Sequence, residues 1–244
     1  MLRLASLGLL LLGCATADPT APSSLEYDDL ALAVGSTVAT PSGGGELGAF
    51  GDVVALAHGR LPTGFTASAD GTITGTHAGL GYRYALVCRD VQGATGACDG
   101  ATDAVAAQVS WTGGLDLPDT GMQLDRTGMW ALSGLTRGVA TASGTATLAY
   151  ASRIANRDRG TESTYRLAYA ATYTDVAYDT VALHAMAGDL HYALVVTRTA
   201  TGSAPSDHAV DASLALLGDG TATIDLDGAQ RYTLDLATGA VVRI

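Results

Sequence analysis

The chain has 244 residues and a formal net charge of −11, and all 13 of its basic residues are arginines because the sequence contains no lysine. Such an acidic surface repels nucleic acid and anionic lipid head groups, so recognition of either through charge is excluded. Only three glutamates occur, whereas threonine, valine and tyrosine are frequent. Helices normally draw on glutamate and lysine, and the frequent residues fit strands, so the composition predicts an all-β fold.

The chain begins with the pattern of a secretory signal. Met1 and Arg3 make a positive head, and residues 4–12 form an apolar run that is too short to cross a bilayer as a helix. No later apolar run approaches the length of about 20 residues that a transmembrane helix needs. We therefore predict that residues 1–13 are a signal peptide and that the protein is exported.

The end of this run, Leu11-Leu12-Gly13-Cys14, resembles the lipobox of bacterial lipoproteins. The resemblance implies cleavage before Cys14, a lipid thioether on its sulfur and acylation of its new amino group. Acyl chains such as palmitate would then hold the protein on a lipid bilayer. Because alanine rather than aspartate follows Cys14, the resemblance also favours the outer membrane of the bacterial cell envelope. The alternative is cleavage after the A-x-A sequence at 15–17, which would release a secreted protein without Cys14.

Residues 14–26 predict a lipidated N-terminus and a flexible tether, because proline, serine and threonine without periodicity cannot form a core. From residue 27 onward, short apolar runs alternate with glycine-containing turns. One such run lies at 31–34, and the pattern predicts a strand at 53–56. The folded part of the protein is therefore expected to begin near residue 27.

Three motifs then follow in order. They are Leu-Pro-Thr-Gly-Phe at 61–65, Gly-Thr-Ile-Thr-Gly-Thr at 71–76, and an alternating segment at 81–93. This order resembles the immunoglobulin-like, cadherin-related domain of many bacterial surface proteins, and it implies an immunoglobulin-like β-sandwich over residues 27–112. The chain departs from that family in having Phe65 where leucine is usual, in its cysteine pair, and in extra residues at 97–102.

Cys88 and Cys98 flank a predicted hairpin turn at 92–93. Tyr82, Tyr84 and Cys88 are spaced at even intervals, so they share one face of a predicted strand, and Cys98 lies on the returning segment. In an exported protein, two thiols left over near one hairpin usually pair. We predict a Cys88–Cys98 disulfide, and two buried free thiols are the alternative.

The second half, residues 113–244, is predicted to be a separate all-β domain, either a sandwich or a small closed barrel, with Gly113-Gly114 as part of a linker. Tyr165, Tyr169 and Tyr173 alternate with polar residues. We interpret these tyrosines as a buried sheet face, as we do Trp111 in the first half, and a ligand cleft is the alternative. The predicted strands are 145–152, 165–176, 180–186, 190–197, 209–217, 221–226, 231–236 and 240–244.

The sequence offers no established catalytic pattern, since G-x-S-x-G, H-E-x-x-H and phosphate-binding glycine loops do not occur. His184, Asp189 and His191 could form a metal or acid–base cluster, but we interpret them as solvated hairpin residues. We therefore predict no catalytic residue and no cofactor.

The aspartates also raise the possibility of a calcium site. Asp225-x-Asp227-Gly228 begins like a calcium loop, but Gln230 and Leu236 stand where an EF-hand needs glycine and glutamate. We interpret the aspartates as surface residues and predict no metal site. A second cluster, near the end of the first half, consists of Asp90, Asp99 and Asp103.

These observations favour an exported, membrane-anchored, non-catalytic cell-surface protein with a binding or structural role. Its expected partners are the lipid bilayer, through acyl chains on Cys14, and a surface protein or glycan, but not nucleic acid. Two alternatives remain open. One is a secreted carbohydrate-active enzyme with an immunoglobulin-like spacer, and the other is a small-ligand carrier with a C-terminal barrel. A convergent polar pocket in the second half would favour these alternatives.

Overall fold

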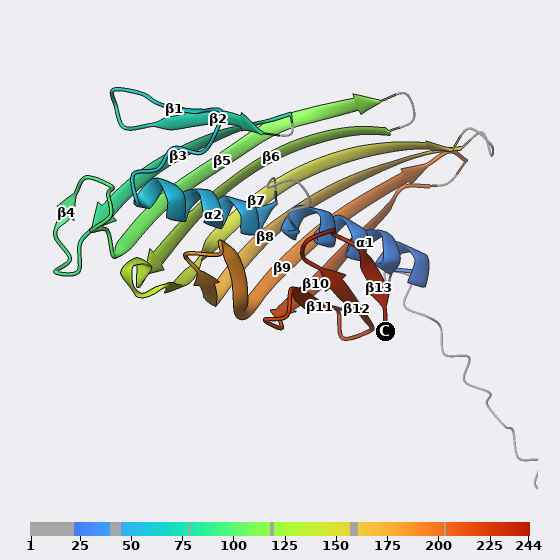
Figure 1. Ribbon diagram of the computed structural model, residues 1–244. Coiled ribbons are helices and arrows are strands. Elements are labelled where there is room, and N and C mark those ends of the chain that lie inside the picture. Colours follow the sequence, from blue (N-terminus) through green and yellow to red (C-terminus); the bar gives the residue numbers. More distant parts are fainter. Residues whose placement is uncertain (1–21, 40–44, 78, 118–119, 157–160, 203) are drawn as a thin grey trace, which may run out of the picture.

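Most of the chain lies in one antiparallel sheet of 13 strands, so the predicted all-β class is confirmed (Figure 1). The computed structural model describes residues 22–39, 45–77, 79–117, 120–156, 161–202 and 204–244. Cys14, the predicted signal peptide and most of the predicted tether lie outside these residues. The strands are β1 (Phe65–Ala67), β2 (Ile73–His77), β3 (Leu80–Arg89), β4 (Thr95–Gly96), β5 (Ala104–Leu117), β6 (Thr120–Ser133), β7 (Val139–Asn156), β8 (Thr161–Asp179), β9 (His184–Ala200), β10 (Ser206–Leu216), β11 (Thr221–Leu226), β12 (Gln230–Asp235) and β13 (Val241–Arg243).

The sheet is a meander in which strands that follow one another along the chain are also neighbours in space. Only β4 leaves this path. It pairs with the last two residues of β3, while β5 pairs with β3 along its whole length. Several of the predicted turns form these connections, and Gly71 and Gly228 take the positive φ angles of 79° and 66° that suit glycine. Strand β6 was not predicted, and the predicted strands 180–186 and 190–197 are replaced by the single strand β9.

Two helices, α1 (Ser24–Val38) and α2 (Glu46–Ala57), follow one another along the face around which the sheet curves (Figure 1). The prediction of a strand at 53–56 was therefore wrong, and the apolar run at 31–34 lies within α1. Helix α1 begins at a capping box, in which Ser23 and Glu26 bind each other's backbone N–H groups. The last three residues of the predicted tether thus belong to this helix. No helix among the described residues is long and apolar enough to cross a membrane.

Alternation along the strands separates a buried face from an exposed one, as the period of two predicts. The buried face packs on the helices and includes Tyr82, Tyr84, Trp111, Tyr169 and Tyr173, none of which is more than 4% exposed. The predicted burial of Trp111 and of the β8 tyrosine face is therefore confirmed. The opposite face carries mostly small and polar side chains.

The sheet is continuous across the predicted boundary between residues 112 and 113, which falls inside β5. Gly113 pairs with Leu80 of β3 on one side and with Leu124 of β6 on the other. A Cβ atom on Gly113 would lie 2.7 Å from the Leu80 side chain, so glycine here permits close strand packing. The structure therefore differs from the predicted pair of successive β-domains, because the glycines interpreted as a linker lie within a strand.

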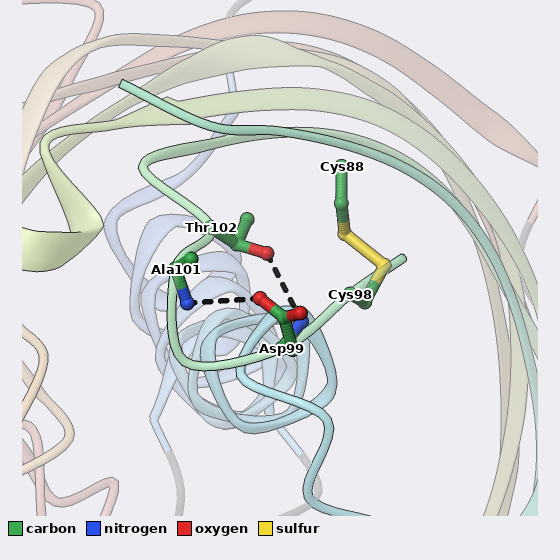
Figure 2. Close-up of a disulfide and its surroundings, with 5 residues drawn as sticks. All are labelled: Cys88, Cys98, Asp99, Ala101 and Thr102. Carbon is green, nitrogen blue, oxygen red and sulfur yellow. Dashed lines mark hydrogen bonds between the residues drawn. A yellow bond between two sulfur atoms is a disulfide. The ribbon is translucent and has the colours of Figure 1, made fainter. Parts of the chain in front are cut away.

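Cys88 and Cys98 lie at disulfide-bonding distance, with an S–S separation of 2.00 Å and a Cα–Cα distance of 5.3 Å (Figure 2). The loop after Cys98 is held by Asp99, whose carboxylate accepts a bond from the Ala101 N–H and whose own N–H donates to the Thr102 hydroxyl. A Cβ atom on Gly59, just beyond α2, would meet the Cys98 carbonyl oxygen at 2.9 Å. The cysteine pair therefore lies where β3 approaches the end of α2.

Candidate functional site

The helices contact the sheet through a repeated pairing of helix carboxylates with sheet tyrosines. Each pair joins a hydroxyl donor on a strand to a carboxylate acceptor on α1 or α2 across the apolar interface. The contacts with normal hydrogen-bond distances are Tyr232 to Asp28 at 2.9 Å, Tyr165 to Asp29 at 2.7 Å, Tyr173 and Tyr192 to Glu46 at 2.6 and 2.8 Å, and Tyr84 to Asp52 at 2.8 Å.

The most buried of these carboxylates is Glu46, the first residue of α2, which is 0% exposed. Arg126 of β6, only 2% exposed, places Nη2 2.8 Å from Glu46 Oε1. The N-terminal end of α2 also favours a negative charge. Burial raises the pKa of the Tyr169, Tyr173 and Tyr192 hydroxyls well above the usual value, so they remain hydrogen-bond donors to Glu46.

Arg126 is enclosed on its other side by tryptophan. Its guanidinium carbon lies 4.3 Å from the centre of the Trp111 ring and 5.7 Å from that of Trp130. Nε and Nη1 of Arg126 have no hydrogen-bond partner among the described residues. Removing one member of a buried ion pair is costly because the other charge is left uncompensated. Because none of its charged atoms reaches solvent, we interpret the Glu46–Arg126 pair as a structural lock between α2 and the sheet.

A groove of about 340 Å³ opens between α1 and strands β7, β8 and β9, and we call it the α1 groove. Its walls are mostly apolar, and Leu32 stands beside it with 52% of its surface exposed. The groove lies away from the Glu46 lock. Its lining residues are Asp29, Leu30, Leu32, Ala33, Ser36, Tyr150, Tyr165, Leu167, Val196 and Gly239.

One charged side chain, Asp29, lines the α1 groove. Its Oδ2 atom accepts a 2.7 Å hydrogen bond from the Tyr165 hydroxyl, and burial together with this carboxylate raises the pKa of Tyr165. The Arg198 guanidinium carbon lies 5.8 Å from the centre of the Tyr165 ring, but its Nη1 is 3.4 Å from Glu26 Oε1. The polar part of the groove is therefore a carboxylate supported by a neutral hydroxyl.

Two other hollows lack this combination. One, of about 280 Å³, lies by the start of α2 and is lined by Leu47, Leu183 and Leu236 among others. Another, of about 450 Å³, lies on the outer sheet face around Val87 and Met129. Neither has a carboxylate in its lining.

Two further hollows, of about 340 and 420 Å³, do include a carboxylate, Asp125 in one and Asp175 in the other. Each of these linings also contains an arginine, Arg166 or Arg89, whereas the lining of the α1 groove contains no basic residue. The α1 groove is therefore the better candidate for selective binding of a small molecule.

The structure does not gather the histidines considered in the sequence into a metal site. His191 lies on the exposed face of β9, where Nε2 is 3.9 Å from Asp211 Oδ1 of β10, and Asp189 shares that face. His184 begins β9 and lines the hollow beside α2. Among the described residues, no group of three potential metal ligands comes together.

The aspartates considered for calcium bind their own turns or neighbouring loops. Asp90 accepts the Gln92 N–H at 2.9 Å, Asp225 accepts the Gly228 N–H at 2.7 Å, and Asp103 accepts from Thr136. Such bonds are typical of aspartate in turns. This agrees with their interpretation as surface residues.

Sequence reasoning missed both Glu46 with Arg126 and the α1 groove. The alternating tyrosines predicted a buried face, but nothing in their spacing identified the acceptor for their hydroxyls. The strongest available signal was Glu46 itself, one of three glutamates, placed after a run of glycines.

A scan with protein-family models and searches of curated proteins and solved structures found no match to this chain.

Proposed function

We propose that the protein is an exported, membrane-anchored, non-catalytic binding protein that holds a small, mainly apolar molecule in the α1 groove. The groove is the observation that carries this proposal. Its volume of about 340 Å³ lies within the range of small-molecule sites, and its apolar walls include one carboxylate–hydroxyl pair, Asp29 with Tyr165.

The chemistry around the groove supports binding more than catalysis. Asp29 and Tyr165 hydrogen-bond each other, and the raised pKa of Tyr165 keeps its hydroxyl protonated at neutral pH. The Glu46–Arg126 pair, which has the strongest electrostatic interactions, is enclosed in the core. Neither arrangement provides an exposed nucleophile paired with a base.

The proposed membrane anchor is Cys14, on the resemblance of residues 11–14 to a lipobox. The nine residues from Cys14 to Pro22 span at most about 30 Å when extended, and α1 begins two residues later. On this proposal, the helix that forms one wall of the groove is the first folded element after the anchor. The groove would then remain close to the bilayer, a source of apolar molecules.

The anchor is tested by changing Cys14 to serine. We expect the parent to incorporate a fatty-acid probe and to sediment with membranes, and Cys14→Ser to do neither. Equal labelling of the parent and the variant would contradict acylation at Cys14. A soluble parent whose new N-terminus follows residue 17 would support the A-x-A cleavage instead.

The groove is tested with N-phenyl-1-naphthylamine, whose fluorescence rises in apolar sites, using the Cys14→Ser protein so that no detergent is needed. Ala33→Phe adds a ring within the groove, so we expect it to weaken probe binding by about tenfold or more, since about 1.4 kcal/mol is lost per factor of ten. Ala193→Phe on the exposed sheet face is the control and should bind like the parent. Equal binding by Ala33→Phe and the parent would refute the groove as the site.

A further inference from the structure

We propose that the ligand of the α1 groove is a cationic amphiphile, an apolar body of about ten to twelve heavy atoms with a protonated amine that binds Asp29. The inference deepens the proposed function and rests on it. It assigns the chemical class of the ligand from the charge of the groove, the shape of its walls and its volume.

The size of the apolar body follows from the volume. A groove of about 340 Å³ holds roughly eleven times the volume of about 30 Å³ that one water molecule occupies in the liquid. Leu30, Leu32 and Ala33 on α1 face Leu167 and Val196 on the sheet across this space. Walls of this kind favour a ligand body without polar groups.

The polar atoms of the lining determine what the other end of the ligand must be. Ser36 already donates its hydroxyl to the Ala33 carbonyl at 2.9 Å, so it is engaged within α1. Tyr150 and Tyr165 contribute hydroxyls, which leaves Asp29 as the charged member of the lining. A ligand group that complements this end of the groove must donate hydrogen bonds.

The Asp29 carboxylate can accept further hydrogen bonds from such a group. A carboxylate has about four acceptor positions, and the hydrogen bond to Asp29 from the described residues comes from the Tyr165 hydroxyl, which carries no charge. Arg198, the nearby cation, is paired with Glu26, as is His208 at 3.6 Å. Among the described residues, no cationic side chain forms an ion pair with Asp29, so its negative charge remains available to a ligand.

The same charge disfavours carboxylate ligands such as fatty acids. A carboxylate head placed beside Asp29 would meet a like charge, and the protein as a whole carries a net charge of −11. An ammonium head would instead gain a charge-assisted hydrogen bond at the same place. Asp29 is exposed to solvent, so attraction in one case and repulsion in the other should together separate the two affinities by up to about tenfold.

Three ten-carbon probes test this inference by displacing N-phenyl-1-naphthylamine from the Cys14→Ser protein at pH 7. They are decylamine, 1-decanol and decanoate, which share one apolar body and differ in the charge of the head. We expect decylamine to displace the probe at concentrations about tenfold below those of decanoate, with decanol between them, and we expect high salt to narrow the difference.

Asp29→Asn, which keeps the shape of the side chain, should bring decylamine and decanoate within about twofold of each other. A far-ultraviolet circular dichroism spectrum that matches the parent's verifies that the variant is folded, so the change in preference can be assigned to the charge of Asp29. Asp211→Asn on the exposed sheet face is the matched control and should keep the parental preference.

The outcomes separate the two proposals. Displacement at equal concentrations by all three compounds, a preference for decanoate, or a decylamine preference that survives Asp29→Asn would overturn the inference while leaving the groove as a binding site. Absence of saturable binding by both the fluorescent probe and decylamine, measured directly by calorimetry, would overturn the proposed function and the inference together.

Discussion

Replacing Glu46 with glutamine tests whether the buried ion pair locks α2 to the sheet. The substitution preserves size but leaves the positive charge of Arg126 buried without its partner at 2.8 Å. Removing one member of a buried pair costs about 3–5 kcal/mol. Since small domains are stable by only about 5–15 kcal/mol, Glu46→Gln should lose a large part of the free energy of unfolding.

Urea denaturation followed by tryptophan fluorescence measures this loss directly, because Trp111 and Trp130 both lie against Arg126. Asp29→Asn is the matched control, since Asp29 also accepts a tyrosine hydroxyl but is exposed to solvent, and it should cost less than about 1 kcal/mol.

Adding Arg126→Met to Glu46→Gln supplies the decisive comparison. The double variant removes the unpaired charge and retains an oxygen acceptor for the surrounding tyrosines, so it should recover at least half of the stability lost in Glu46→Gln. A loss below about 1 kcal/mol in Glu46→Gln, or a double variant no more stable than the single one, would refute the lock.

Two further predictions concern stability. Non-reducing peptide mapping should find Cys88 linked to Cys98, and reduction should cost about 2–3 kcal/mol for a loop spanning 10 residues, whereas two alkylatable thiols in the unreduced, denatured protein would contradict the bond. Stability should also fall as the pH rises above about 10, because burial raises the pKa of Tyr27 and Tyr82 to about 12. The unfolded chain then releases these protons first, so the loss should develop between about pH 10 and 12, and a flat urea midpoint over that range would speak against it.

Local patterns in the sequence predicted the parts of the structure that depend on local spacing. The alternation around Tyr169 and Tyr173 identified a buried strand face, and the hairpin at 92–93 predicted that Cys98 returns to bonding distance of Cys88. These features depend on a period of two and on turn chemistry, both of which operate over a few residues.

The features that sequence reasoning missed depend on distant contacts or on ambiguous runs. Short apolar runs such as 31–34 and 53–56 fit a strand or a buried helix equally well, and the strand-rich composition favoured the wrong choice. A glycine such as Gly113 is compatible with a linker and also with a close contact between strands, so the residue type alone does not distinguish the two. The acceptor of the Tyr169 hydroxyl is Glu46, which lies 123 positions earlier in the chain, beyond the reach of any periodic pattern.

The meander also sets an order of assembly. Its neighbouring strands can pair as local hairpins, yet α1 at the beginning of the fold binds the last strands, through Tyr232 to Asp28 across 204 positions and Arg243 to Asp28 across 215. Closing such long loops is slow compared with forming hairpins. A chain that crosses a membrane from its N-terminus would expose α1 first and its partners last. On the proposal that the protein is exported, the apolar side of α1 would therefore face solvent until the last strands have crossed the membrane and paired.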